Sequence, residues 1–566
     1  MQPVSPRVRG MLSRLVSVVA AVAGIAAGGT LFAADKDVGI PAVEFINAQV
    51  AAGWADIKLQ PAPAATDGEW CRRVHLDVIG RVPTVGELEA FLADPSPNKQ
   101  ARLVDRLLGE DSSEEYASNW TEVWTTLLIG RSGDNDRVNR SGMRQWLRRA
   151  LARNMPYDQF MHELVTATGV NKAGEPGFNG ATNFLAGKLE ENGLQATART
   201  AQIFLGLQVQ CTQCHNHPFN TGRQNQFWEF NAFFRQTRAL RRFGGTQEIQ
   251  AVELVDEDFR GEGGNPEQAE LYYELRNGLM KVAYPVFIDG TAISASGYLP
   301  GVMEDGTRFG THRRRELAGL IAASPLFPRA QVNRLWGHFL GHGFTRPVDD
   351  LGDHNPPSHP DLLTGLADRF REHSFNTKEL VRWIVLSRPY GLSSKASKGN
   401  ATDDPASGEP PRFSRFYLRQ MRAEELYQSL LTATEADAAD AKGEKASRPK
   451  DQWLAQFIIA FGTDEGDDAT TFNGSIPQVL MMFNGGLMKT ATAAGEGGFL
   501  DRTVQGERKN AVRIQQLYMA ALARKPSRSE IAAATRLVEA RQGDAVGALQ
   551  DVWWALLNSN EFILNH

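Results

Sequence analysis

The chain has 566 residues, of which 42% are apolar and 22% are charged, and its formal net charge is −5. This length allows two or three domains with sizeable cores, and both fractions are ordinary for a soluble globular protein. The weak negative charge argues against a general nucleic-acid binder, whose surface is usually basic, and it implies no dominant electrostatic partner.

Residues 1–34 have the pattern of a secretory signal peptide. Three arginines precede an apolar run, rich in Ala and Gly, from Leu15 to about Phe32, and the run ends at Ala33 and Ala34. A basic start, a short apolar middle and small residues at the end are typical of a segment that is removed on export. The alternative is an uncleaved N-terminal anchor. We expect an exported protein, in the periplasm or cell envelope, with no membrane span in the mature chain, because no later stretch has the roughly 18 consecutive apolar residues that a membrane helix needs.

Most of the mature chain has apolar residues at helical spacing. Two of the expected helices start with a capping-box pattern, Thr84 with Glu87 and Ser527 with Glu530. Glycines and short alternating segments between residues 240 and 310 predict a few strands and turns. The sequence therefore predicts a mainly α, multi-helical protein in which two helical domains are joined by a short β-containing segment. We place the N-terminal helical domain at 35–240, the linker with short strands at 241–310 and the C-terminal helical domain at 311–566.

Before the first of these helices, His75 and Asp77 lie two positions apart in an apolar stretch. They could belong to a site, but we favour a buried Arg–Asp network, since buried polar groups are almost always hydrogen-bonded. The neighbouring Cys71 is a lone thiol, a residue that is more often buried than reactive.

The strongest chemical signal is the motif Cys211-Thr212-Gln213-Cys214-His215, which we name the CxxCH motif. Two cysteines three positions apart and followed at once by histidine are the attachment pattern of a c-type haem. Residues i and i+3 share a face on a helical turn, so both thiols can reach the two vinyl groups on one edge of a porphyrin. His215 can then turn towards the iron as its axial ligand. We expect the sequence from Gln195 to about Gln210 to be a helix that delivers the cysteines at its C-terminal end.

Three other interpretations of this motif stay open. Cys211 and Cys214 with His215 and His217 offer two thiolates and two imidazoles, an acceptable tetrahedral zinc set. The two cysteines could instead form a disulfide or redox pair in an oxidising compartment. They could also be reduced and simply packed.

A second chemical candidate is the run from Gly341 to Asp361, which we name the acidic segment. Its carboxylates and imidazoles could hold a divalent ion, or one carboxylate could act as a general base. Asp349, Asp350 and His359 are the candidate residues. A hydrolase built on them requires the acidic segment to meet the CxxCH motif or to form an open pocket of its own. The structural alternative is that Ser358 caps a helix, with Asp361 completing a capping box.

Several stretches together resemble a known pairing of domains. They are residues 72–84, 154–160 and 198–219 in the N-terminal half, and residues 330–336, 346–350, 355–360, 386–390 and 554–562 in the C-terminal half. On these residues the chain resembles an exported, planctomycete-type family. That family joins an N-terminal cytochrome-C-labelled domain of unknown function to a C-terminal planctomycete-specific domain of unknown function.

The resemblance covers most of the chain after the signal segment, and its cytochrome label rests largely on the Cys-x-x-Cys-His segment. Asn216 stands where the family often has aspartate, which weakens any metal site that needs an acid there. The first hypothesis is an exported protein that binds haem c through Cys211 and Cys214, with an electron-transfer or redox function and an unknown redox or envelope partner. The second is a non-redox cell-envelope binding or scaffold protein with zinc or a disulfide at the same motif. The third is a metal-dependent hydrolase.

Overall fold

Capping residues set the start of several helices. In the computed structural model, Thr84 and Ser527 each accept a hydrogen bond from the backbone N–H three residues on, and the side chains of Glu87 and Glu530 bond back. Both predicted capping boxes are therefore confirmed.

The structure describes residues 39–131, 135–245, 248–256, 271–293, 301–302, 308–309, 312–436, 447–462, 476–494, 497–506, 509–541 and 543–566. The predicted signal peptide, residues 1–34, lies outside these residues.

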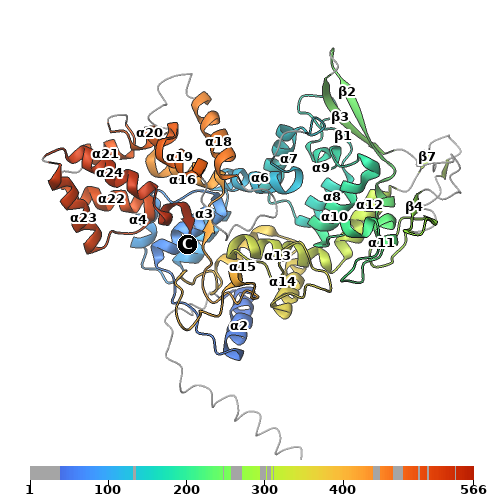
Figure 1. Ribbon diagram of the computed structural model, residues 1–566, viewed down its shortest axis with the longest axis horizontal. Coiled ribbons are helices and arrows are strands. Elements are labelled where there is room, and N and C mark those ends of the chain that lie inside the picture. The colour runs from blue at the N-terminus through green and yellow to red at the C-terminus, as the bar shows by residue number, and fades with distance from the viewer. Residues whose placement is uncertain are drawn as a thin grey trace, which may run out of the picture. The chain divides into compact units, whose positions relative to one another are not determined.

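Helices make up most of the described residues, so the predicted fold class, mainly α with small β-containing parts, is confirmed (Figure 1). The N-terminal helices are α2 (Pro41–Asp56), α3 (Asp67–Ile79), α4 (Val85–Ala93), α5 (Lys99–Leu108), α6 (Ser113–Ile129), α7 (Arg140–Ala152), α8 (Tyr157–Thr166), α9 (Asn183–Ala186), α10 (Leu194–Leu205) and α11 (Gln224–Asn231). Short 3-10 turns lie among them, η1 (Gly180–Thr182), η2 (Glu191–Gly193), η3 (Gln210–Gln213) and η4 (Ala232–Phe234).

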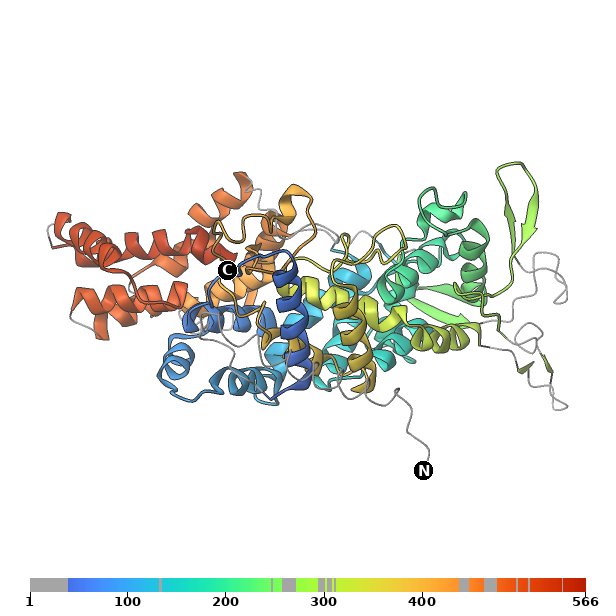
Figure 2. The same ribbon diagram turned by 90° about the horizontal axis from the view of Figure 1, so that it is seen from below.

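A second series of helices follows the β-containing part. It comprises α12 (Arg313–Ala323), α13 (Leu326–Leu340), α14 (Pro360–Glu372), α15 (Thr377–Val385), α16 (Ala423–Thr434), α18 (Ser447–Phe461), α19 (Ile476–Asn484), α20 (Gly486–Thr492), α21 (Phe499–Gly506), α22 (Asn510–Leu522), α23 (Arg528–Ala540), α24 (Ala545–Leu557) and α25 (Asn560–Ile563), with the 3-10 turn η6 (Pro405–Ser407) between α15 and α16. In both Figure 1 and Figure 2, α22, α23 and α24 lie side by side, as do α8 and α12.

Small antiparallel sheets take strands from the predicted β-containing segment and its border, and also from residues 169–170, 419–420 and 564–565 outside it. The largest has the order β1–β3–β2, and its ladder between β2 and β3 pairs Thr237 with Asp256. The strands of these sheets are β1 (Gly169–Val170), β2 (Thr237–Phe243), β3 (Ile249–Asp256), β4 (Tyr272–Glu274), β5 (Met280–Val282), β6 (Gly301–Val302), β7 (Arg308–Phe309), β8 (Arg419–Gln420) and β9 (Leu564–Asn565). β4 pairs with β5, β6 with β7, and β8 with β9.

Among the described residues, two large apolar cores hold the helices, and a small third cluster contains Leu271 and Tyr273. The larger core takes residues from both sides of the predicted linker, and the ring of Tyr157 on α8 stacks on Phe327 of α13 with centroids 4.9 Å apart. The smaller core joins Leu76 of α3 to α16, α22 and α24, with Trp553 fully buried in it. The predicted domain boundaries stay a prediction. Burial of apolar residues from both sides of a boundary in one core favours helices that fold against one another across it.

Asp77 is the centre of the buried Arg–Asp network that the sequence predicts. Its Oδ1 accepts hydrogen bonds from Arg419 of β8 at 2.6 Å and from Asn565 of β9 at 2.8 Å, and its Oδ2 accepts one from the Tyr390 hydroxyl at 2.7 Å. All four side chains are buried. The network joins α3 to the short β8–β9 ladder.

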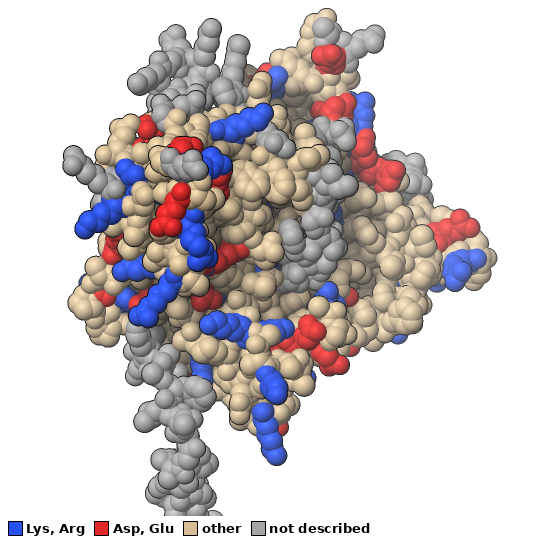
Figure 3. Space-filling view, turned by 60° about the vertical axis from the view of Figure 1, so that its left-hand side comes forward, with Lys and Arg blue, Asp and Glu red and all other residues tan. Residues whose placement is uncertain are grey.

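Two further observations concern the charge of the surface and the hydropathy of the described helices. Basic and acidic side chains are interspersed on the face that Figure 3 shows. Within the described ranges, no helix has both the length and the hydropathy to cross a bilayer.

Candidate functional site

The CxxCH motif lies on a 3-10 turn of its own, not at the end of the preceding helix. Helix α10 ends at Leu205, because Gly206 adopts a left-handed conformation with φ of 64°. The prediction that the helix continues to about Gln210 is therefore wrong. The turn η3 contains Cys211 and ends at Gln213, and Cys214 follows as its capping residue with φ and ψ of −103° and −26°. The backbone therefore stays helical from one cysteine to the next, which keeps them near one face, because a 3-10 helix has three residues per turn.

Both motif thiols face solvent. Cys211 and Cys214 are exposed free thiols, while Thr212 between them is buried. The third cysteine, Cys71, is fully buried, and burial raises the pKa of its thiol to about 12. The turn is anchored from α11, since Trp228 and Gln224 both donate to the carbonyl oxygen of Gln213. Only the two motif cysteines are therefore accessible for covalent or metal chemistry.

The two histidines of the motif region are held in opposite ways. The Nδ1 of His215 lies 2.7 Å from the carbonyl oxygen of Asn216. A carbonyl only accepts, so Nδ1 carries the proton and the lone pair is on Nε2. The Nδ1 of His217 accepts hydrogen bonds from the backbone N–H groups of Phe219 (3.2 Å) and Asn220 (3.1 Å), which places the proton of a neutral ring on Nε2. His215 is thus arranged as a ligand through Nε2, and His217 is not.

The acidic segment meets the loop that follows the motif. The hydroxyl of Thr221 donates to Asp353 Oδ2 at 2.8 Å, and Asn220 Nδ2 lies 3.4 Å from His354 Nδ1. The rings of His217 and His354 face each other with centroids 5.3 Å apart. Segments separated by 132 residues in the sequence are therefore in contact.

The three candidate residues of the acidic segment point in different directions. Asp349 accepts hydrogen bonds from Gln202 of α10 and, at 3.2 Å, from Gln208. Asp350 is buried and lies 3.1 Å from His354 Nε2. His359 is at the start of α14, and burial lowers its pKa to about 4. No group of three or more His, Cys, Asp or Glu side chains among the described residues is placed to hold a metal ion.

The predicted capping box at Ser358 and Asp361 is wrong. Helix α14 begins at Pro360, one residue later than that box requires, and no side chain caps it. Proline fixes φ and lacks an N–H, so it suits the first helical position. The Ser358 hydroxyl instead contacts Nδ1 of His359 at 3.0 Å.

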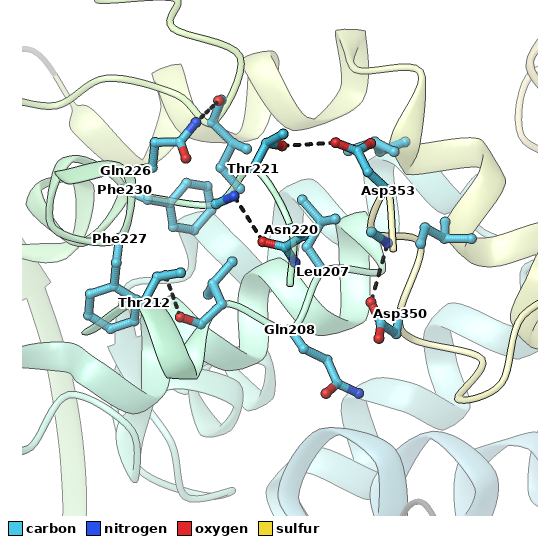
Figure 4. A pocket seen from close by; sticks show the side chains of 16 residues that line it. Leu207, Gln208, Thr212, Asn220, Thr221, Gln226, Phe227, Phe230, Asp350 and Asp353 are labelled. Carbon is cyan, nitrogen blue, oxygen red and sulfur yellow. Dashed lines mark hydrogen bonds between the residues drawn. The ribbon is translucent and has the colours of Figure 1, made fainter. Parts of the chain in front are cut away.

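A cavity of about 250 Å³ lies where the two segments meet, and Figure 4 shows its lining. The buried Thr212 of the motif lines it, while neither motif cysteine does. Phe227 and Phe230 of α11 form one side, and Asp350 and Asp353 lie on the opposite side. The motif turn therefore has an exposed face with the two thiols and an inner face on the cavity.

Sequence reasoning did not identify the residues that join the two segments. Thr221, Asn220 and His354 carry no local pattern that distinguishes them from loop residues. The aromatic cluster that contains Phe227 and Phe230 is visible in the sequence, but its place beside the acidic segment depends on contacts between distant parts of the chain. Covariation between residues 220–221 and 353–354 is the signal that could have found them.

Comparison with known families gives two matches. Residues 45–239 match PSCyt2, described as "Protein of unknown function (DUF1549)", and residues 313–538 match PSD1, described as "Protein of unknown function (DUF1553)". No curated protein and no solved structure matches the chain. The CxxCH motif and Thr221 lie in the first matched region, and the acidic segment lies in the second. The chain therefore contains a PSCyt2 domain of unknown function followed by a PSD1 domain of unknown function.

Proposed function

We propose that the protein is exported and carries one c-type haem on the exposed face of the motif turn, where it exchanges electrons with a partner in the periplasm or cell envelope. The Cys211 and Cys214 thiols would each add across one vinyl group, sulfur to one carbon and hydrogen to the other, with no net oxidation. His215 Nε2 would ligate the iron. A bound haem would supply one-electron exchange at its iron.

The contrast between His215 and His217 is the observation that carries this proposal. The hydrogen bond from His215 Nδ1 to a backbone carbonyl fixes the tautomer in the way that is usual for metal-bound histidines. The alternative zinc set needs His217 as well, and the two backbone donors on its Nδ1 disfavour that role. The donors present therefore fit the ligand set of a c-type haem better than that of a four-coordinate zinc ion.

The size of the cavity supports a haem that lies outside it. Pockets that enclose drug-sized ligands are about 300–1,000 Å³, and the cavity behind Thr212 is smaller. The residues that would hold a porphyrin, Cys211 and Cys214, are exposed. The nearby Phe219 side chain is 80% exposed and could cover part of such a ring. An exposed haem edge suits electron transfer between proteins.

The test is expression of the full chain in a host that matures c-type cytochromes. We expect a Soret band, an alkaline pyridine haemochrome with one haem per chain, and a mature protein that lacks residues 1–34. Cys211→Ser and Cys214→Ser should each lower covalent haem content, while Cys71→Ser, which changes a buried thiol, should leave it unchanged. His215→Ala should change the iron absorption spectrum, and the matched His217→Ala should not.

Two results would overturn the proposal. One is a colourless mature protein from a host that matures another c-type cytochrome in the same cells. The other is one zinc ion per chain that is lost in Cys211→Ser, which would instead support the scaffold hypothesis.

A further inference from the structure

The cavity behind the motif turn has a one-sided charge. Sixteen residues line it, and among these described residues two are aspartates and none is Lys, Arg or His. Much of the remaining wall is apolar: Leu207, Phe227, Phe230, Ile288, Leu326 and Leu351. A lining of this kind disfavours phosphates and carboxylates, because its ionisable side chains are both carboxylates.

The two aspartates differ in what they can offer a ligand. Both oxygens of Asp350 have partners inside the protein, the backbone N–H of Gly352 at 3.2 Å and His354 Nε2 at 3.1 Å. Asp353 is exposed, and its Oδ2 accepts only the Thr221 hydroxyl. Its Oδ1 makes no hydrogen bond with any residue that the structure describes. Thr221 orients the Asp353 carboxylate, so this oxygen is an acceptor placed at the rim of an apolar cavity.

We propose that this cavity binds a small alkylammonium ion, with the ammonium group on Asp353 and the alkyl part between the apolar walls. An ammonium group is donor-only, which matches a carboxylate with a vacant acceptor. Aromatic side chains such as Phe227 and Phe230 accommodate both the alkyl chain and, within about 6 Å of a ring, the cation itself. The site is separate from the haem-type chemistry, since neither motif thiol nor His215 lines it.

Titration calorimetry of the full chain with n-butylammonium, 1-butanol and butyrate tests this proposal. The three probes have nearly the same size and differ in charge. We expect n-butylammonium to bind at near-neutral pH, and the neutral and anionic probes to bind at least about tenfold more weakly, the effect of losing one charge-assisted hydrogen bond.

Two variants with the same chemical change locate the binding site. Asp353→Asn should weaken n-butylammonium binding by about tenfold or more, whereas Asp361→Asn, which removes an exposed carboxylate on the first turn of α14, should leave it unchanged. Asp353 is exposed, so its variant should keep the thermal midpoint of the parent chain. The double variant Cys211→Ser, Cys214→Ser should bind as the parent does, which separates this result from the outcome of the haem test.

Three outcomes would refute the proposal. They are butanol or butyrate binding as tightly as n-butylammonium, unchanged binding by Asp353→Asn, and no heat from n-butylammonium at millimolar concentrations.

Discussion

The substitution Asp77→Asn should lower the free energy of unfolding by about 3–5 kcal/mol, the usual effect of breaking a buried ion pair from one side. Asp77 is 1% exposed, and its charge is paired with Arg419 at 2.6 Å. Asparagine keeps the shape and one acceptor, but it leaves the Arg419 guanidinium buried without a counter-charge. Urea unfolding at neutral pH, followed by far-UV circular dichroism, measures the change.

Two further variants make the test specific. Asp105→Asn removes an aspartate that pairs with Arg382 at 2.7 Å on the surface, where the Asp105 side chain is 52% exposed, so it should change the free energy by less than about 1 kcal/mol. The double variant Asp77→Asn, Arg419→Gln should be less destabilised than the sum of its two single variants, because it removes both buried charges. Equal losses for Asp77→Asn and Asp105→Asn, or an additive double variant, would contradict the reasoning.

Other consequences are testable in the same way. Gly206→Ala should lower the free energy of unfolding in urea by about 1–3 kcal/mol, because φ is +64° and a Cβ would lie 2.9 Å from Leu351 Cδ1. Gly319→Ala should not lower it, because Gly319 lies in the middle of α12 with no atom within 4 Å of the added Cβ. Burial lowers the pKa of His75 from 6.5 to about 4. Between pH 6.5 and pH 4 the unfolded chain therefore binds a proton at His75 that the folded chain does not bind. The free energy of unfolding should keep its full value above pH 6.5 and fall by up to about 3 kcal/mol as the pH is lowered to 4. His75→Leu should reduce that dependence in unfolding curves measured across this range. Thr221→Val should lower stability by at most about 1 kcal/mol in the same assay, since its hydrogen bond is exposed; a larger loss would mean that the two segments depend on this bond alone.

Features determined by neighbouring residues could be predicted from the sequence. The capping boxes at Thr84 and Ser527 need only two side chains three residues apart, and both form. The end of α10 is predicted too late because Leu207 continues the apolar spacing of Ile203 past Gly206, while the left-handed conformation of that glycine ends the helix. At Ser358 the serine pattern is present, but Pro360 moves the start of the helix by one residue.

The candidate site could be predicted only in part. Residue spacing indicates that Cys211 and Cys214 share a face, and this depends on local geometry alone. The orientation of His215 depends on a contact with the next residue's carbonyl, which spacing does not determine. The cavity wall formed by Asp350 and Asp353 depends on long-range packing, and no local pattern connects residues 221 and 353.

The bond between Thr221 and Asp353 also has a consequence for how the protein is made. Synthesis proceeds from the N-terminus, so more than a hundred residues must leave the ribosome after the motif before its inner face is covered. Until then Phe227 and Phe230 lack the opposite wall. A fragment that ends near residue 240 would keep the thiols but would expose these rings to water, so the first matched region cannot be studied as an independent module without a new solvent-facing apolar surface.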